Sequence, residues 1–249
     1  MELIVCMKRV PDSAAKIRVA DDGQGIDPGG VEYVISPYDE IALERAIQIK
    51  EASGGNITVV CLGPAEATKE IRQALAMGAD KAIHIKDPGG SRGPLGIARV
   101  LADTLRGREF DAILFGKQSI DSDNSAVGVM VAGLLDLPIV SVATKLDIAD
   151  GKATVHREAD VGTEVVEVAL PAVFTAQRGL AEPRYPSIKG IMMAKKKPIE
   201  EVDAPAPSGN LQLEKLEPPP ERQGGKIVGE GPEAAAELAR LLRQEAKVV

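Results

Sequence analysis

Aromatic residues are scarce in this chain, whose 249 residues include three Tyr, three Phe and no Trp. Proteins that bind single-stranded nucleic acids stack successive bases on aromatic side chains, so this scarcity argues against such a role. The formal net charge of −7 argues the same way, because a general nucleic-acid binder needs a basic surface. We therefore expect no nucleic-acid partner.

Cysteine is equally scarce, and Cys6 and Cys61 each lie inside a short apolar run. This placement predicts buried, reduced thiols and disfavours a disulfide framework or a metal-binding pair. The first residues lack the pattern of a signal peptide, and the longest mostly apolar stretch, 126–135, is about half as long as a membrane span. We therefore expect a cytoplasmic protein.

Recognisable catalytic motifs are missing as well. The sequence contains no P-loop, no C-x-x-C and no H-E-x-x-H, and no G-x-G-x-x-G follows a predicted strand. Its two histidines, His84 and His156, lie in predicted strands, and no nucleophile or metal ligand stands at a suitable spacing. We therefore do not expect an enzyme that carries out bond chemistry with catalytic residues of its own.

Strand-like and helix-like segments alternate over the first two thirds of the chain. Apolar runs predict strands at 2–7, 57–62, 81–85 and 111–115, and helical patterns occupy about 36–53, 64–78, 96–105 and 123–135. Ser36 can cap the first of these helices, and Asp39 favours the positive end of its dipole. This series predicts a doubly wound, Rossmann-like α/β fold with a mainly parallel sheet.

Further β-structure is expected on either side of this series. The turn Asp150-Gly151 separates two strands that form a hairpin, 143–148 and 153–158, and more strands follow at 164–170 and 172–176. The early excursion 16–34 carries turn signals and predicts a small hairpin.

The composition changes after Lys197, where prolines are set among Gly, Ser and charged residues up to 231. Such a segment cannot build a core and should be extended. A short amphipathic helix is expected at 233–245, with Leu238, Leu241 and Leu242 on one face. We therefore expect a domain over 1–190 and a C-terminal arm over 191–249, which either packs back or, as we favour, embraces a neighbouring subunit.

The segment 182–198, EPRYPSIKGIMMAKKKP, combines an apolar cluster with three consecutive lysines. Ile188, Ile191, Met192 and Met193 could supply buried contact to a partner, and the adjacent charge could steer it. An ordinary loop followed by a solvated lysine cluster explains the same residues, so the composition leaves both interpretations open.

A nucleotide site is expected beyond the carboxyl ends of the parallel strands. The loop 116–128, GKQSIDSDNSAVG, runs there from a strand into a helix, whose N-terminal N–H groups suit a phosphate. Alternatively, Asp121, Ser122 or Asp123 simply caps the helix, and the two carboxylates would repel a phosphate unless they turn outward.

Five motifs in order resemble the beta subunit of electron transfer flavoprotein. They are MKRVPD (7–12) with KIRV (16–19), SPYDEIALE (36–44), ALAMGADKAIHI (74–85), LFGKQSIDSDNSAVG (114–128) and EPRYPSIKGIMMAKKKPIE (182–200). The resemblance covers about residues 1–200. It implies an adenine-nucleotide-binding α/β fold and a heterodimer in which the alpha subunit carries the redox-active FAD and the beta subunit holds a structural AMP.

The resemblance also implies partners and site residues. Electrons would come from an acyl-CoA or other flavin dehydrogenase, which docks on 182–198, and would pass to a quinone oxidoreductase, while the arm wraps the alpha subunit. The implied cofactor-binding residues are Cys6, Ser36, Pro37, Tyr38, Asp39, Leu62, Gly116, Lys117, Gln118, Ser119, Ile120, Asp121, Ser122, Asp123, Asn124, Ser125, Ala126 and Val127. The implied docking residues are Tyr185, Ile188, Lys189, Ile191 and Met192.

Two departures from the family pattern matter. Ile188 stands at the position of the family's anchoring leucine, and Lys189 stands where many members have proline. In electron-bifurcating members a second FAD replaces AMP and the loop reads D-G-D-T-A-Q-V-G-P. This chain matches that loop only at its two Asp, its Val and its first Gly after Val, so AMP remains our choice and FAD the alternative.

A stand-alone nucleotide-binding regulator is a further alternative, but it would leave the docking loop and the arm without a role.

Overall fold

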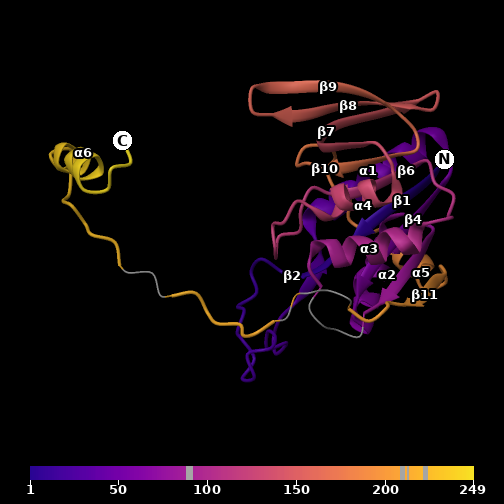
Figure 1. Cartoon of the computed structure of the whole chain (residues 1–249), viewed down its shortest axis with the longest axis horizontal. Coiled ribbons are helices and arrows are strands. Elements are labelled where there is room, and N and C mark those ends of the chain that lie inside the picture. Colours follow the sequence, from indigo (N-terminus) through magenta and orange to yellow (C-terminus); the bar gives the residue numbers. More distant parts are fainter. Residues whose placement is uncertain (88–91, 208–210, 212, 221–223) are drawn as a thin grey trace. The chain divides into compact units, whose positions relative to one another are not determined.

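The computed structural model describes residues 1–87, 92–207, 211, 213–220 and 224–249 (Figure 1). The chain divides into two compact units, Met1–Lys215 and Leu216–Val249. This division falls after Lys215, whereas the C-terminal arm was expected to begin at 191.

Within the described residues, one nine-stranded sheet organises the first unit, with strand order β11-β5-β4-β1-β6-β10-β7-β8-β9. The strands are β1 (Glu2–Met7), β4 (Asn56–Gly63), β5 (Lys81–Lys86), β6 (Ala112–Gly116), β7 (Ile139–Ala149), β8 (Lys152–Ala159), β9 (Gly162–Ala169), β10 (Ala172–Ala176) and β11 (Ile199–Asp203). Pairing is parallel from β11 to β7, and β7, β8 and β9 pair antiparallel. The predicted mainly parallel α/β sheet is confirmed.

Helices cover both faces of this sheet. They are α1 (Pro37–Ser53), α2 (Thr68–Met77), preceded by the 3₁₀ turn η1 (Ala65–Ala67), α3 (Pro94–Leu105) and α4 (Val127–Leu135). Along β1, Leu3 and Val5 share a core with α1 and α2, and Ile4 and Cys6 share the other core with α3 and α4. Because successive side chains of a strand point to opposite faces, a strand buried on both sides should be apolar, as β1 is from Leu3 to Met7.

The hairpin predicted around Asp150-Gly151 is present. The small hairpin predicted at 16–34 is reduced to an isolated bridge between Val19 and Ile26, and the strands that flank this excursion, β2 (Arg9–Pro11) and β3 (Tyr33–Ile35), pair antiparallel. The turn between β7 and β8 has positive φ at both Asp150 (50°) and Gly151 (74°). These angles are those of the two-residue turn that matches the twist of a hairpin.

The proline-rich segment departs from its expected role at its start. Its residues 199–203 are extended, as expected, but they form β11 and pair in parallel with β5, from Ile199 opposite Ala82 to Asp203 opposite Lys86. A short helix, α5 (Ile188–Ala194), precedes this strand in the segment expected to be a docking loop.

The second unit contains α6 (Ala234–Gln244), which carries the predicted leucines Leu238, Leu241 and Leu242. Among the described residues, no helix is long and apolar enough to cross a membrane.

Candidate nucleotide-binding site

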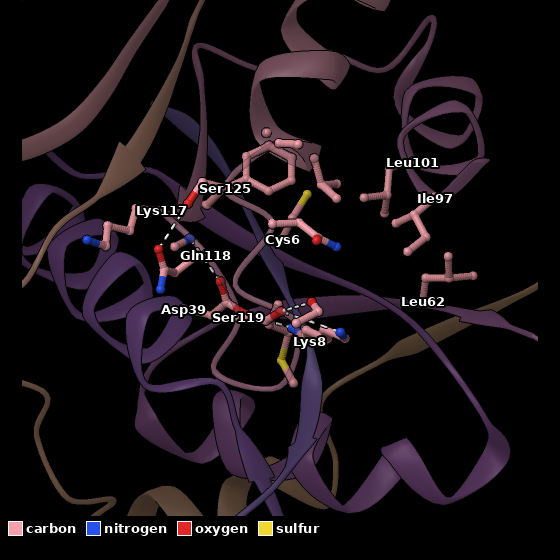
Figure 2. A pocket seen from close by; sticks show the side chains of 18 of the residues that line it. Cys6, Lys8, Asp39, Leu62, Ile97, Leu101, Lys117, Gln118, Ser119 and Ser125 are labelled. Atoms are coloured by element: carbon pink, nitrogen blue, oxygen red, sulfur yellow. Dashed lines mark hydrogen bonds between the residues drawn. The ribbon is translucent and has the colours of Figure 1, made fainter. Parts of the chain in front are cut away.

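A pocket with a volume of about 290 Å³ lies at the carboxyl edge of the sheet, where β1 separates β4 from β6 (Figure 2). After β1 the strands are added on one side, first β4 and then β5, and β6 is then added on the other side of β1. The strand order reverses at β1, and doubly wound folds bind ligands at such a switch point. Its walls come from the ends of β1, β4, β5 and β6, from α1 and α3, and from the loop that leads into α4.

Most of the implied cofactor-binding residues line this pocket, namely Cys6, Asp39, Leu62, Gly116, Lys117, Gln118, Ser119, Ser122, Asn124, Ser125, Ala126 and Val127. The remaining ones, Ser36, Pro37, Tyr38, Ile120, Asp121 and Asp123, lie beside it without forming its wall. The structure adds residues that the sequence analysis did not propose: Met7, Lys8, Asp87, Arg92, Ile97, Leu101, Phe115 and Gly128.

Asp39 joins the two strand ends that flank the pocket. Its carboxylate accepts the backbone N–H of Lys8 after β1 and the backbone N–H of Gly116 at the end of β6, each at 2.8 Å. A Cβ atom at Gly116 would lie 2.5 Å from Oδ1 of Asp39, so only glycine permits this approach. Burial raises the pKa of Asp39 to about 7, although both backbone donors and the Lys8 ammonium oppose the rise.

The predicted side-chain cap of α1 is not made. Ser36 occupies the N-cap position, yet its side chain accepts no capping hydrogen bond, and its buried Oγ has no partner among the described residues. The backbone instead closes the helix start, since Asp39 and Glu40 donate their N–H groups to the Ser36 carbonyl.

The acidic side chains of the loop are held by partners of their own. The Lys8 ammonium lies 2.6 Å from Oδ2 of Asp121, and Gln118 donates to Asp123 at 2.6 Å. Partial burial raises the pKa of Asp121, but hydrogen bonds from Lys8 and Ser119 outweigh it, so the pKa lies below its usual range. Asp121 is therefore an ionised carboxylate neutralised by Lys8, which weakens the objection that it would repel a phosphate.

The loop folds back on itself before α4 begins. Asp123 and Ser125 adopt left-handed φ values of 48° and 49°, and the Ser125 hydroxyl donates to the Gln118 side chain at 2.9 Å. As a result α4 starts at Val127 rather than at 123, and its N-cap residue Ala126 supplies no side-chain cap. None of the three predicted capping residues caps this helix, so its first N–H groups border the pocket without a side-chain acceptor.

The pocket has an apolar end and a polar end. Leu62, Ile97 and Leu101 lie together on one side of it, opposite the polar side chains of the loop (Figure 2). Arg92 and Asp87, which also line the pocket, form an ion pair at 2.8 Å, and Arg92 donates to the Pro205 carbonyl as well. Among the described residues, no group of His, Cys, Asp or Glu is placed to hold a metal ion.

Comparison with known proteins identifies the family. The family model described as "Electron transfer flavoprotein domain" matches residues 25–207. The chain is 44% identical to the electron transfer flavoprotein subunit beta of Bacillus subtilis (strain 168), over the whole of both chains. The chain belongs to the electron transfer flavoprotein family. It is also 41% identical to the subunit beta of Syntrophomonas wolfei, covering 100% of this chain and 98% of the relative, and 40% identical to that of Homo sapiens, covering 98% of each.

Membership of the electron transfer flavoprotein family confirms the resemblance drawn from the sequence motifs. The subunit name of these relatives implies an alpha-subunit partner, and a flavoprotein family implies an associated flavin nucleotide. Proteins of this family carry electrons on cofactors, which the polypeptide binds and orients.

The implied docking residues of this electron transfer flavoprotein subunit lie outside the pocket, on and before α5. Tyr185 is 96% exposed and Ile188 is 82% exposed, and Lys189, Ile191 and Met192 are exposed as well. Large apolar side chains of this kind are usually buried, so their clustering on one short helix marks a candidate interaction surface.

Proposed function

We propose that this chain is the AMP-binding beta subunit of a heterodimeric electron transfer flavoprotein. The complex accepts electrons from an acyl-CoA or other flavin dehydrogenase and passes them towards a quinone oxidoreductase. FAD, held mainly by the alpha subunit, supplies the redox chemistry, and this chain supplies binding and docking surfaces. The observation that carries the nucleotide role is the two-ended pocket at the switch point of the sheet.

The residues of the pocket fit an adenine nucleotide. The apolar end, with Leu62, Ile97 and Leu101, suits a planar base, and the loop and the start of α4 offer hydrogen-bond donors to a phosphate. Lys8 pairs with Asp121 of the loop and offsets the negative charge of that carboxylate beside the N-terminus of α4, which itself favours an anion.

A second FAD in place of AMP is the alternative. The volume of about 290 Å³ lies just below the usual range for ligand sites, about 300–1,000 Å³, which favours a mononucleotide over a dinucleotide. A dinucleotide would have to extend beyond these walls.

The decisive experiment counts the nucleotides. We expect co-expression with the alpha subunit to yield a yellow heterodimer that releases one FAD and one AMP on denaturation, measured by chromatography against standards. Release of two FAD and no AMP would replace our proposal with an electron-bifurcating subunit. A colourless protein that does not bind the alpha subunit would favour a stand-alone regulator.

We assign the docking of the dehydrogenase to α5 and the residues just before it. Ile188, Ile191 and Met192 form the exposed apolar face, and Lys189, Lys195 and Lys196 are exposed around it. This combination fits a partner with an apolar hollow and an acidic rim.

We propose that the second unit, Leu216–Val249, binds the alpha subunit. Leu238, Leu241 and Leu242 give α6 an apolar stripe, and none of the residues of α6 is buried. A helix of this kind gains its stability by packing against another surface, which supports an arm that holds the partner subunit.

A further inference from the structure

Helix α5 has only seven residues, which is too short for a stable isolated helix in water. One of its residues, Ala194, is buried, while its apolar side chains Ile188, Ile191 and Met192 face solvent. Side chains packed under the helix therefore do little to hold it, and its order must come from its two ends and its backbone.

Two cations cap α5 and α2 reciprocally. The Arg72 guanidinium of α2 donates from Nη1 to the carbonyls of Ala194 at 2.6 Å and Lys197 at 2.7 Å. The Lys197 ammonium donates in return to the carbonyls of Leu75 at 2.8 Å and Ala79 at 2.6 Å. Carbonyls at helix ends lack partners within the helix and attract cations, so each side chain satisfies the end of the other element.

A glycine lets the two backbones meet. A Cβ atom at Gly190 would lie 2.4 Å from the Ala76 carbonyl oxygen of α2, so a larger residue would push α5 away. The other end of the segment is also fixed. Ser187 caps α5 by accepting from the Gly190 N–H at 3.0 Å, and Arg184 pairs with Glu44 of α1 at 2.8 Å.

We propose that Arg72 and Lys197 are positioning residues that hold α5 in its docking conformation before the dehydrogenase arrives. This inference rests on the docking role proposed above. Neither residue needs to touch the partner, because both are half-buried and both donate their hydrogen bonds to backbone carbonyls of this chain. Their contribution is preorganisation: a surface that is already ordered loses less conformational entropy on binding.

The test uses the purified heterodimer carrying Lys197→Met, which keeps an unbranched side chain but removes its donors. We expect the apparent KM for the dehydrogenase to rise about tenfold, with kcat and flavin content unchanged. Hydrogen exchange of the free heterodimer should show faster exchange of the 191–196 amides. Lys197→Arg, which retains donors, should recover most of the affinity.

Lys196→Met is the matched control, because it removes the same charge from the neighbouring exposed position. Its effect should act through electrostatic steering, disappear at high salt and leave amide exchange unchanged, whereas the effect of Lys197→Met should persist. If Lys197→Met lowers the yield of folded protein, Arg72→Lys tests the same cap. It replaces the guanidinium that donates to the Ala194 and Lys197 carbonyls by a shorter ammonium, so the apparent KM for the dehydrogenase should rise as well.

The outcomes separate this inference from the docking role itself. If Ile188→Ala weakens docking at high salt while Lys197→Met and Arg72→Lys do not, the positioning role is wrong and the docking role stands. Faster amide exchange without a change in KM also overturns the positioning role. If Ile188→Ala has no effect either, the docking assignment fails.

Discussion

At the scale of single residues, Asp39 most directly connects the fold with the pocket. Its carboxylate holds the ends of β1 and β6 together through two backbone N–H groups. Burial raises the pKa of Asp39 from 3.8 to about 7, so the folded protein binds this proton more tightly than the unfolded chain. The resulting stabilisation is fully present below about pH 4 and is lost as pH rises to about 7.

Asp39→Asn should therefore change how stability depends on pH. At about pH 5 we expect the variant to be less stable by about 1 kcal/mol, because its amide nitrogen cannot accept the N–H that a carboxyl oxygen accepts. The deficit should shrink towards about pH 8, where the parent must keep an ionised carboxylate buried and the variant does not. Urea denaturation of both proteins across this range measures the difference.

Asp136→Asn is the control for this experiment. Asp136 is exposed and adopts a left-handed φ of 56° at the end of α4, a conformation that Asn also tolerates. This variant measures what an exposed Asp-to-Asn change does to stability over the same pH range. A difference for Asp39→Asn that does not change with pH would show that Asp39 does not titrate between these limits.

At the scale of elements, the central strands could be predicted well because burial on both faces leaves a continuous apolar run. The predicted strand 2–7 coincides with β1, and the predicted strand 57–62 lies within β4. The hairpin around Asp150-Gly151 was equally predictable, since its turn residues suit positive φ.

Elements that depend on tertiary contacts could not be predicted in this way. Strand β11 follows Pro198 at the edge of the sheet, and only two of its five residues are even half-buried, so its apolar pattern is weak. Helix α5 is ordered by Arg72 and Lys197, which a local pattern does not reveal. The predicted start of α4 at 123 was too early, because Asp123, one of the expected capping residues, and Ser125 both adopt left-handed conformations.

The pocket was predictable where the fold itself places the ligand. The rule that ligands bind beyond the carboxyl ends of strands located the ends of β1, β4 and β6 and the loop before α4. It did not reveal Ile97 and Leu101 of α3, because apolar residues at helical spacing predict core rather than a ligand wall. Lys8 lies within the motif MKRVPD (7–12), but its pairing with Asp121 is visible only in the folded structure.

Ile188→Ala tests the exposed face of α5. A docked apolar anchor is worth about 2 kcal/mol or more, so we expect the apparent KM for the dehydrogenase to rise at least about tenfold. Flavin content and kcat should not change, because Ile188 is not among the residues that line the pocket. Stopped-flow or steady-state reduction of the heterodimer by the dehydrogenase gives both parameters.

Val161→Ala is the matched control, because Val161 is a fully exposed aliphatic residue outside the docking segment. It should leave KM unchanged. An equal rise in both variants would indicate a general loss of stability, and no rise in Ile188→Ala would contradict the docking assignment.

At the scale of the whole molecule, the two units are stabilised in different ways. The residues of both hydrophobic cores lie within Met1–Lys215, whereas none of the residues of α6 in the second unit is buried. The first unit therefore resembles a complete domain, and the second resembles a segment whose order depends on what it binds. In the proposed heterodimer, such an arm would add contact with the alpha subunit through a separate segment.

Replacing Leu238, Leu241 and Leu242 together by Gln tests this role in the full-length chain. Gln retains helix propensity and removes the apolar stripe, so we expect at least about a hundredfold loss of affinity for the alpha subunit, since each buried Leu contributes about 1.5–3 kcal/mol. Glu237→Gln with Arg240→Gln is the control, because it removes an exposed ion pair of the same helix at constant net charge and should cost little. Binding measured by calorimetry or by dilution of the heterodimer distinguishes the two. If the leucine variant binds the alpha subunit as tightly as the parent, α6 is not part of the subunit interface and the arm needs another explanation.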